Sequence, residues 1–190
     1  MKKILQAKEK VLHKIAEEVP VSEIKSTKIK KVLKEMSEAL KSQYDGVAIA
    51  APQIGYSLRI FVVSGKVFTG EFIDRGVSET ETPSLRPESE HSPLAGGENV
   101  GDVVFINPKI SKLSREKEWL PEGCLSVRPL FGKTWRSKKA TVSAYDENGK
   151  KFTRGASGLL AQIFQHETDH LNGILFIDHA KDIKEELPQK

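Results

Sequence analysis

The stretch QHETDHLNG, residues 165–173, is the part of this sequence that most clearly indicates its fold. It contains an H-E-x-x-H pattern near the end of residues 157–171, a segment that predicts a helix stopped by an Asn-Gly pair. At 3.6 residues per turn, His166 and His170 would lie on one helix face and could share one metal ion. Glu167 could reach a water molecule on that metal without being a ligand. The competing interpretation is two helix histidines on a solvated face, because five-residue patterns also arise by chance.

A third ligand is available in EGCLS, residues 122–126, which contains the single cysteine of the chain. As a thiolate, Cys124 would complete a Cys–His₂ set and leave a fourth position open, as catalytic metal sites do. The neighbouring glycine and serine predict a tight, exposed loop. An inert buried cysteine is the alternative. One cysteine also excludes an intrachain disulfide.

A third segment, GVAIAAPQIG at residues 46–55, combines small residues with one amide side chain. Small residues let a backbone segment lie close to a ligand, and Gln53 could donate a hydrogen bond to an oxyanion. The same alanines and glycines could instead simply pack a helix end against a sheet. Taken by itself, this segment leaves both interpretations open.

The remaining elements predict an α+β domain, with mostly antiparallel sheets packed around the C-terminal metal-binding helix and with an N-terminal helix. Apolar residues at helical spacing predict that N-terminal helix, with Ser26 or Thr27 as its N-cap. An Asn-Gly turn predicts a hairpin, because both turn residues tolerate a positive φ. The predicted helix covers residues 26–43, and the predicted strands are residues 58–63, 102–110, 140–145 and 151–156.

Residues 64–99 differ from the rest of the chain, because they are rich in acids, prolines and glycines and have no apolar period. They predict a long, flexible inserted loop. Its apolar residues near the preceding strand, Phe68, Phe72 and Ile73, are expected to pack onto the sheet edge, and the alternative is that they cover the substrate pocket as a lid. Without an internal repeat or linker, residues 1–190 are interpreted as a single catalytic domain.

The composition indicates a solvated surface and excludes several function classes. The 190 residues carry 30 basic and 26 acidic side chains spread along the chain, for a net charge of +4. This pattern does not favour a DNA partner, although a weak affinity for ribosomal RNA remains open. No apolar run suits a signal peptide or a membrane span, so we expect no membrane partner and a cytoplasmic location, with an organelle not excluded.

The three segments, in this order, resemble the motifs of the peptide deformylase family. The resemblance extends over residues 11–178 and includes Ile106-Asn107-Pro108 and the turn at residues 146–149. It implies removal of the formyl group from the N-terminal formylmethionine of nascent peptides, with release of formate. It also implies Fe²⁺ as the metal, with Zn²⁺, Ni²⁺ or Co²⁺ as substitutes. Transient association with the ribosome is a further expectation from the family.

The resemblance also implies roles for individual residues. Glu167 would transfer protons, while the Gln53 side chain and the Leu125 backbone N–H would polarise the formyl oxygen. The implied metal ligands are Cys124, His166 and His170. The implied substrate-binding residues are Val47, Ala48, Gly123, Leu159 and Ile163, of which the last two could line a methionine pocket or simply pack the core.

Two departures from the family pattern keep other functions open. Ala48 replaces a glycine, and Arg128 follows the cysteine motif where the family often has proline, which places a charge near the site. One alternative is an H-E-x-x-H metallopeptidase, for which His179 is the only plausible downstream ligand. The other is a catalytically weak, deformylase-like binding module. Matching family positions suggest that Arg136 and Asp169 pair and brace the metal-binding helix, and an ordinary surface pair is the alternative.

Overall fold

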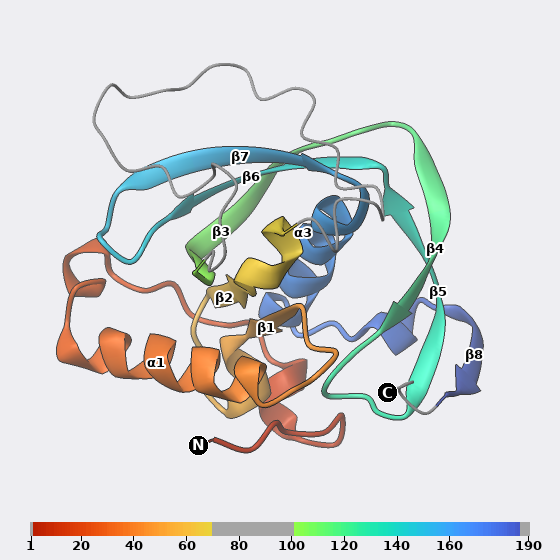
Figure 1. The fold of residues 1–190 in the computed structure, drawn as a ribbon, viewed down its shortest axis with the longest axis horizontal. Coiled ribbons are helices and arrows are strands. Elements are labelled where there is room, and N and C mark those ends of the chain that lie inside the picture. Colours follow the sequence, from red (N-terminus) through yellow and green to blue (C-terminus); the bar gives the residue numbers. More distant parts are fainter. Residues whose placement is uncertain (1, 70–100, 187–190) are drawn as a thin grey trace.

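The computed structural model describes residues 2–69 and 101–186, whose strands form two antiparallel sheets (Figure 1). The five-stranded sheet has the order β1 (Ala48–Ala50), β2 (Ile60–Val63), β3 (Val103–Leu113), β6 (Lys139–Tyr145) and β7 (Lys151–Ser157). The three-stranded sheet has the order β4 (Lys117–Gly123), β5 (Leu130–Ser137) and β8 (Lys181–Glu185). The α-helices are α1 (Thr27–Lys41) and α3 (Gly158–Leu171). The 3₁₀ turns are η1 (Lys10–His13), η2 (Val21–Glu23), η3 (Ala51–Ile54), η4 (Gly65–Phe68) and η5 (Phe176–Asp178). The predicted α+β class is confirmed.

Helix α3 lies between the two sheets (Figure 1). Its side chains Leu160 and Phe164 are buried against one face of the five-stranded sheet. The Phe164 ring lies 6.3 Å from the ring of Phe61 and 5.2 Å from that of Phe105. On the side of the three-stranded sheet, Gln162 Nε2 donates a hydrogen bond to the Pro121 carbonyl at 2.9 Å. The helix is therefore fixed from both sides, which in turn fixes the two histidines it carries.

Both ends of α3 lie where the sequence predicted them. Ser157 occupies the N-cap position in an extended conformation, although its side chain makes no capping hydrogen bond. Beyond the last turn, Gly173 adopts a positive φ of 74°. A Cβ atom there would meet the backbone of His13 at 2.7 Å, so the glycine also lets the N-terminal segment pass close by. The helix end and the N-terminal segment are thus packed directly together.

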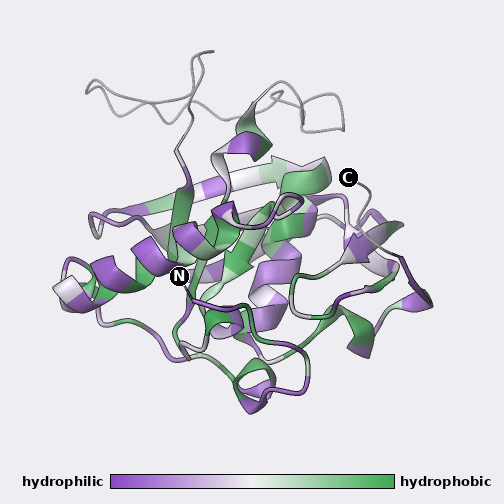
Figure 2. Cartoon of the chain, turned by 60° about the horizontal axis from the view of Figure 1, so that its bottom comes forward, coloured by the Kyte–Doolittle hydropathy of each residue, from purple (hydrophilic) through white to green (hydrophobic). Residues whose placement is uncertain are grey.

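Helix α1 covers the other face of the five-stranded sheet. Ser26, one of the two predicted caps, accepts a hydrogen bond from the Ile29 N–H at 3.3 Å. The buried stripe includes Val32, Met36 and Leu40, which pack in one cluster with side chains of β1 and β2. Figure 2 shows the same division along α1, with hydrophilic and hydrophobic residues on different sides of the helix. The amphipathic period predicted this element correctly.

The predicted hairpin is confirmed as β6 and β7, but its turn is built differently. Of the turn residues, only Gly149 has a positive φ, at 76°, so the expectation that Asn148 shares this conformation was wrong. The Asp146 side chain accepts hydrogen bonds from the N–H groups of Asn148 and Lys150 at 2.9 and 2.8 Å. These bonds hold Asn148 in an ordinary conformation, because the longer loop needs a left-handed residue only at the glycine.

The segment that was expected to be a loop begins with a short ordered turn. Gly65–Phe68 form η4, and Phe68 packs against the main core, as expected for edge packing. The guanidinium of Arg154 lies 4.6 Å from the Phe68 ring centroid. Phe72 and Ile73, with the rest of the predicted loop up to residue 99, lie outside the described residues. Within the described ranges, no helix is both long enough and apolar enough to cross a membrane.

Candidate metal centre and active site

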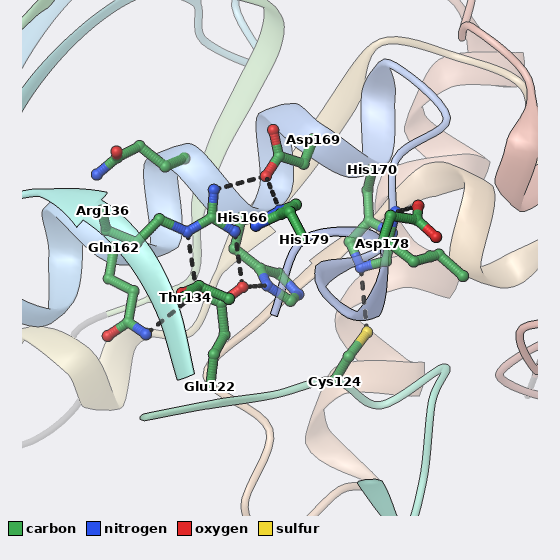
Figure 3. A network of polar contacts seen from close by, with 12 residues as sticks. Glu122, Cys124, Thr134, Arg136, Gln162, His166, Asp169, His170, Asp178 and His179 are labelled. Atoms are coloured by element: carbon green, nitrogen blue, oxygen red, sulfur yellow. Dashed lines mark hydrogen bonds and ion pairs between the residues drawn. The ribbon is translucent and has the colours of Figure 1, made fainter. Parts of the chain in front are cut away.

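The structure brings the three predicted metal ligands together. The ligand atoms of Cys124, His166 and His170 all lie within 4.8 Å of one another. Cys124 Sγ is 3.1 Å from His170 Nε2, and the two imidazole rings are 4.8 Å apart with an interplanar angle of 81° (Figure 3). The histidines come from adjacent turns of α3, and the cysteine directly follows β4. Two elements distant in sequence therefore supply one three-ligand cluster.

Cys124 is buried, with 8% of its surface exposed, so the expectation of an exposed loop was wrong. It packs in a small apolar cluster that includes Leu12, Leu175 and Phe176. Its sulfur also accepts a hydrogen bond from the Ser126 N–H at 3.4 Å. The small neighbouring residues let the chain turn tightly at the end of β4 and aim the side chain inward. A thiol in this position is shielded from solvent and held against His170.

Glu122 orients His166, a role that the sequence analysis did not assign to it. Its Oε1 lies 2.7 Å from His166 Nδ1, while the Arg136 guanidinium donates to both of its oxygens at 2.7 and 3.0 Å (Figure 3). Thr134 adds a hydrogen bond at 2.7 Å. Strand alternation could have found this residue, because positions two apart point to the same side and Cys124 is two residues further on.

The expected pair between Arg136 and Asp169 is present. Arg136 Nη1 donates to Asp169 Oδ2 at 2.6 Å, so this buried guanidinium joins β5 to both β4 and α3. A buried arginine that bridges two carboxylates fixes its partners geometrically. The pair is therefore part of the support of the metal-binding helix.

The charges in the site favour a cation. Burial by itself raises the pKa of Glu122, but His166 and Arg136 outweigh it and hold that pKa well below its usual range. Burial lowers the pKa of His170 well below its ordinary value, which keeps this imidazole neutral and able to bind a metal. Burial lowers the pKa of His166, but the neighbouring Cys124 and Glu122 outweigh it and raise that pKa well above its ordinary value. With Glu122 accepting from Nδ1–H, the Nε2 atom is the one that a metal would bind, in place of the proton there.

Glu167 is buried next to the cluster without being part of it. Only 3% of its surface is exposed, and within the described ranges its Oε2 atom has no hydrogen-bond partner. Burial is the main reason that the pKa of Glu167 is raised, to about 7. A carboxyl group with a pKa near neutrality can both accept and donate a proton at physiological pH. This environment suits a general acid and base.

Gln53 is held rigidly at the opposite wall. Its Oε1 accepts a hydrogen bond from the Ala50 N–H at 2.8 Å, which fixes the direction of the amide. Its Nε2 donates to Ser126 Oγ at 3.1 Å and approaches Cys124 Sγ at 3.5 Å. Gln53 lies on η3, which packs against α1 and α3, so the segment both packs the fold and reaches the site. The two interpretations of the small-residue segment are compatible.

A pocket of about 340 Å³ opens onto this cluster. Gln53, Leu125 and Glu167 line this pocket. So do all the predicted substrate-binding residues, which are Val47, Ala48, Gly123, Leu159 and Ile163. Leu159 and Ile163 also pack against the main core, so lining the pocket and packing the core are compatible for these two residues. Gly123 is required by close packing, because a Cβ atom there would lie 2.4 Å from the ring of Phe131.

The residues present fit a divalent metal ion. A thiolate and two imidazoles form a donor set suited to iron or zinc, and the unpaired oxygen of Glu167 lies at the same pocket. His179, the downstream third ligand that a metallopeptidase would use in place of Cys124, lies elsewhere, with Nε2 3.4 Å from Asp169 Oδ2. The geometry therefore supports a three-ligand catalytic site with one open position.

Comparisons with known proteins agree with this geometry. A family model described as polypeptide deformylase matches residues 1–186. Peptide deformylase 2 of Clostridium acetobutylicum is 35% identical, with 94% of each chain covered. Chloroplastic peptide deformylase 1A of Solanum lycopersicum is 36% identical over 94% of this chain, which spans 59% of that relative's length. The crystal structure of an Acinetobacter baumannii peptide deformylase with bound Met-Ala-Ser is similar, with a TM-score of 0.74, 28% identity and coverage of 94% of this chain and 97% of that one. This chain belongs to the peptide deformylase family.

Proposed function

We propose that this chain removes the N-formyl group from the N-terminal formylmethionine of newly synthesised polypeptides and releases formate. One observation carries the proposal: a buried Glu167 carboxyl, whose Oε2 atom has no hydrogen-bond partner among the described residues, lies beside a Cys–His₂ cluster at the floor of a pocket with an apolar wall. Family membership supports the same reaction. Residues 1–190 would form a single catalytic domain.

The residues that would hold the metal are Cys124, His166 and His170, and we propose Fe²⁺ as the native ion. When bound, such an ion supplies a Lewis acid and lowers the pKa of a water molecule at its open position. Thiolate and imidazole ligands also suit Zn²⁺, Ni²⁺ and Co²⁺, which we expect to substitute. Glu122 orients His166 for this role.

Glu167 would move the protons of the reaction. It accepts a proton from the attacking water as the new carbon–oxygen bond forms at the formyl carbon. It then gives that proton to the amine nitrogen as the carbon–nitrogen bond breaks, so that formate and a free amino terminus leave. A pKa of about 7 suits both transfers, because neither protonation state is strongly disfavoured.

Two donors would hold the developing negative charge on the formyl oxygen. They are the Gln53 side-chain amide and the Leu125 backbone N–H, whose residues both line the pocket. Donors that are already fixed in place cost no reorganisation during the reaction. Gln53 meets this condition, because Ala50 and Ser126 hold its amide. The methionine side chain would lie against Leu159 and Ile163, with Val47, Ala48 and Gly123 along the peptide backbone.

Neither alternative is favoured by a specific observation. A metallopeptidase would need a further ligand, and His179 lies beside Asp169 instead. A silent binding module would not need a buried carboxyl such as that of Glu167, whose Oε2 atom lacks a hydrogen-bond partner in the part of the chain that the structure describes, because such burial is costly unless the group is used. In the cell, we expect nascent formylated chains as substrates and transient association with the ribosome. The location would be the cytoplasm or, as the name of the tomato relative indicates for that protein, an organelle.

Formate release from formyl-Met-Ala-Ser by protein purified without oxygen and loaded with Fe²⁺ tests the proposal. Acetyl-Met-Ala-Ser is the matched control, since it differs only in the acyl group. We expect formate in a metal-dependent reaction with the first peptide and no acetate from the second. Cleavage at an internal peptide bond would instead support a metallopeptidase, and no turnover by fully loaded protein would support a binding module.

A further inference from the structure

The rim of the pocket carries a pair of opposite charges that the reaction itself does not use. Asp45, in the loop before β1, and Arg128, in the loop before β5, form an ion pair, and both line the pocket. Their side chains are each 33% exposed. The two other carboxylates that line the pocket, Glu122 and Glu167, are only 6% and 3% exposed. Glu122 and Glu167 therefore lie on the floor of the pocket, and the Asp45–Arg128 ion pair lies at its rim.

The ion pair also connects the two segments that would hold the substrate. Asp45 directly precedes Gly46 and Val47, and Arg128 lies three residues beyond Leu125. All five residues line the pocket. A peptide held between these segments by its backbone passes close to the two charged side chains.

The charges at this place do not cancel. Lys66 Nζ donates to the Tyr44 carbonyl at 3.0 Å, next to Asp45, and its charge interacts with the Asp45 carboxylate. Two cations, Arg128 and Lys66, thus face one carboxylate. Within the described part of the chain, the Arg128 guanidinium donates to Asp45 alone. A guanidinium has five N–H donors, so Arg128 can also donate hydrogen bonds to a second carboxylate.

The part of the substrate that reaches the rim is the chain after the methionine. A pocket of about 340 Å³ has room for the formylmethionyl group, with its side chain against Leu159 and Ile163. The following residues must then leave the pocket across the rim. An extended peptide advances about 3.3 Å per residue, so the second and third side chains come within reach of a long arginine there.

We infer that Arg128 and Asp45 form a selectivity pair that favours peptides with an acidic side chain at the second or third position over peptides with a basic one. The inference rests on the proposed function and adds a substrate preference to it. Arg128 attracts the carboxylate of the substrate, and Asp45 weakens this attraction because it neutralises part of the positive charge of Arg128. Because both groups are partly exposed, the effect on kcat/KM is about fivefold rather than several orders of magnitude.

The experiment compares kcat/KM for formyl-Met-Glu-Ser against formyl-Met-Lys-Ser, and for formyl-Met-Ala-Glu against formyl-Met-Ala-Lys. For at least one of these pairs, the acidic peptide should be preferred by about fivefold at low salt. Arg128→Gln should remove that preference and Asp45→Asn should increase it. Arg128→Lys, which keeps the charge, should retain most of it. High salt should weaken the preference in the unmodified protein.

Lys133→Gln is the matched control, because it also removes one positive charge from an ion pair, Lys133–Asp182, that does not line the pocket. It should leave the preference unchanged. Melting temperatures of all variants show whether each remains folded. An unchanged preference in folded Arg128→Gln, or an equal change in Lys133→Gln, overturns the inference. Failure of the proposed function is distinguishable, because then formyl-Met-Ala-Ser itself is not deformylated.

Discussion

At the scale of single residues, the proposed mechanism assigns metal binding and proton transfer to different groups. Glu167 is buried beside the cluster but is not one of the three clustered ligands. Glu167→Ala should therefore keep its metal and lose activity by at least about 100-fold, the usual effect of removing a general acid and base. Metal content by elemental analysis, together with kcat, checks this. Loss of metal from the variant would show that Glu167 is a ligand.

Glu122 should affect the metal without touching it. Replacing it by alanine removes the acceptor that orients His166 and leaves the buried Arg136 guanidinium with fewer partners. We expect metal affinity to fall by about 10- to 100-fold, the usual effect of losing a supporting hydrogen bond to a ligand. The free energy of unfolding should fall by about 3 to 5 kcal/mol. Competition with a chelator and urea denaturation measure the two effects.

Glu116→Ala is the control for that variant, because Glu116 forms an exposed ion pair with Lys138. Glu116→Ala should leave metal affinity unchanged and should alter the free energy of unfolding by less than about 1 kcal/mol. Unaltered metal affinity in Glu122→Ala would mean that Glu122 serves only to neutralise Arg136.

The sequence predicted that Cys124, His166 and His170 come together beside Glu167, because their spacing is set by a single helix turn and by one unique cysteine. It did not predict the support given by Glu122, because that role depends on which strand faces α3. It also mistook the exposure of Cys124, because small neighbours permit a tight turn but do not say which way the side chain points. Both features depend on contacts between elements that are distant in sequence, and a local sequence pattern does not contain such contacts.

At the scale of elements, a comparison of two glycines distinguishes the effect of backbone conformation on stability from the effect of close packing. Gly149 and Gly173 have nearly equal φ values of 76° and 74°. A Cβ atom at Gly149 would meet nothing within 4 Å, whereas at Gly173 it would meet backbone atoms of His13 and Lys14 at 2.7 to 2.9 Å. Gly149→Ala should cost about 1 to 2 kcal/mol for the left-handed conformation alone. Gly173→Ala should cost about 1 to 3 kcal/mol more, because of overpacking.

Urea denaturation of the two alanine variants gives the comparison directly. Equal losses of stability would mean that the N-terminal segment moves away freely from the end of α3. The hydrogen bond from the Ala16 N–H to the Leu171 carbonyl at 2.9 Å ties the two together nearby and argues against such movement.

Most elements were predictable because each has its own local pattern: the apolar stripe of α1, the alternation in β6 and β7, and the Asn-Gly end of α3. Strands β1, β4, β5 and β8 had no predicted range. Strand β8 has the weakest local pattern, because Lys181–Glu185 has one apolar residue in five and is exposed throughout. It exists through pairing with β5, which the local sequence does not encode. The hairpin turn was misjudged for a similar reason, since the Asp146 side chain selects its conformation.

At the scale of the whole molecule, the metal would join α3 to the end of the three-stranded sheet. A ligand that binds only the folded state stabilises it by about 4 kcal/mol when present at 1,000 times its Kd. Removing the metal with a chelator should therefore lower the melting temperature markedly. Cys124→Ala is the control, and its melting temperature should not respond to the chelator. An equal shift in that variant would mean that the chelator acts elsewhere.

A titration of metal-free protein with Fe²⁺ under anaerobic conditions, with formate release from formyl-Met-Ala-Ser measured at each step, tests whether the Cys–His₂ cluster is the catalytic metal site. We expect no activity without metal, a linear rise in rate, and saturation at about one ion per chain, as one three-ligand site requires. Cys124→Ala should show no rise over the same range. Full activity in the metal-free protein, or an equal rise in Cys124→Ala, would show that this cluster is not the catalytic site.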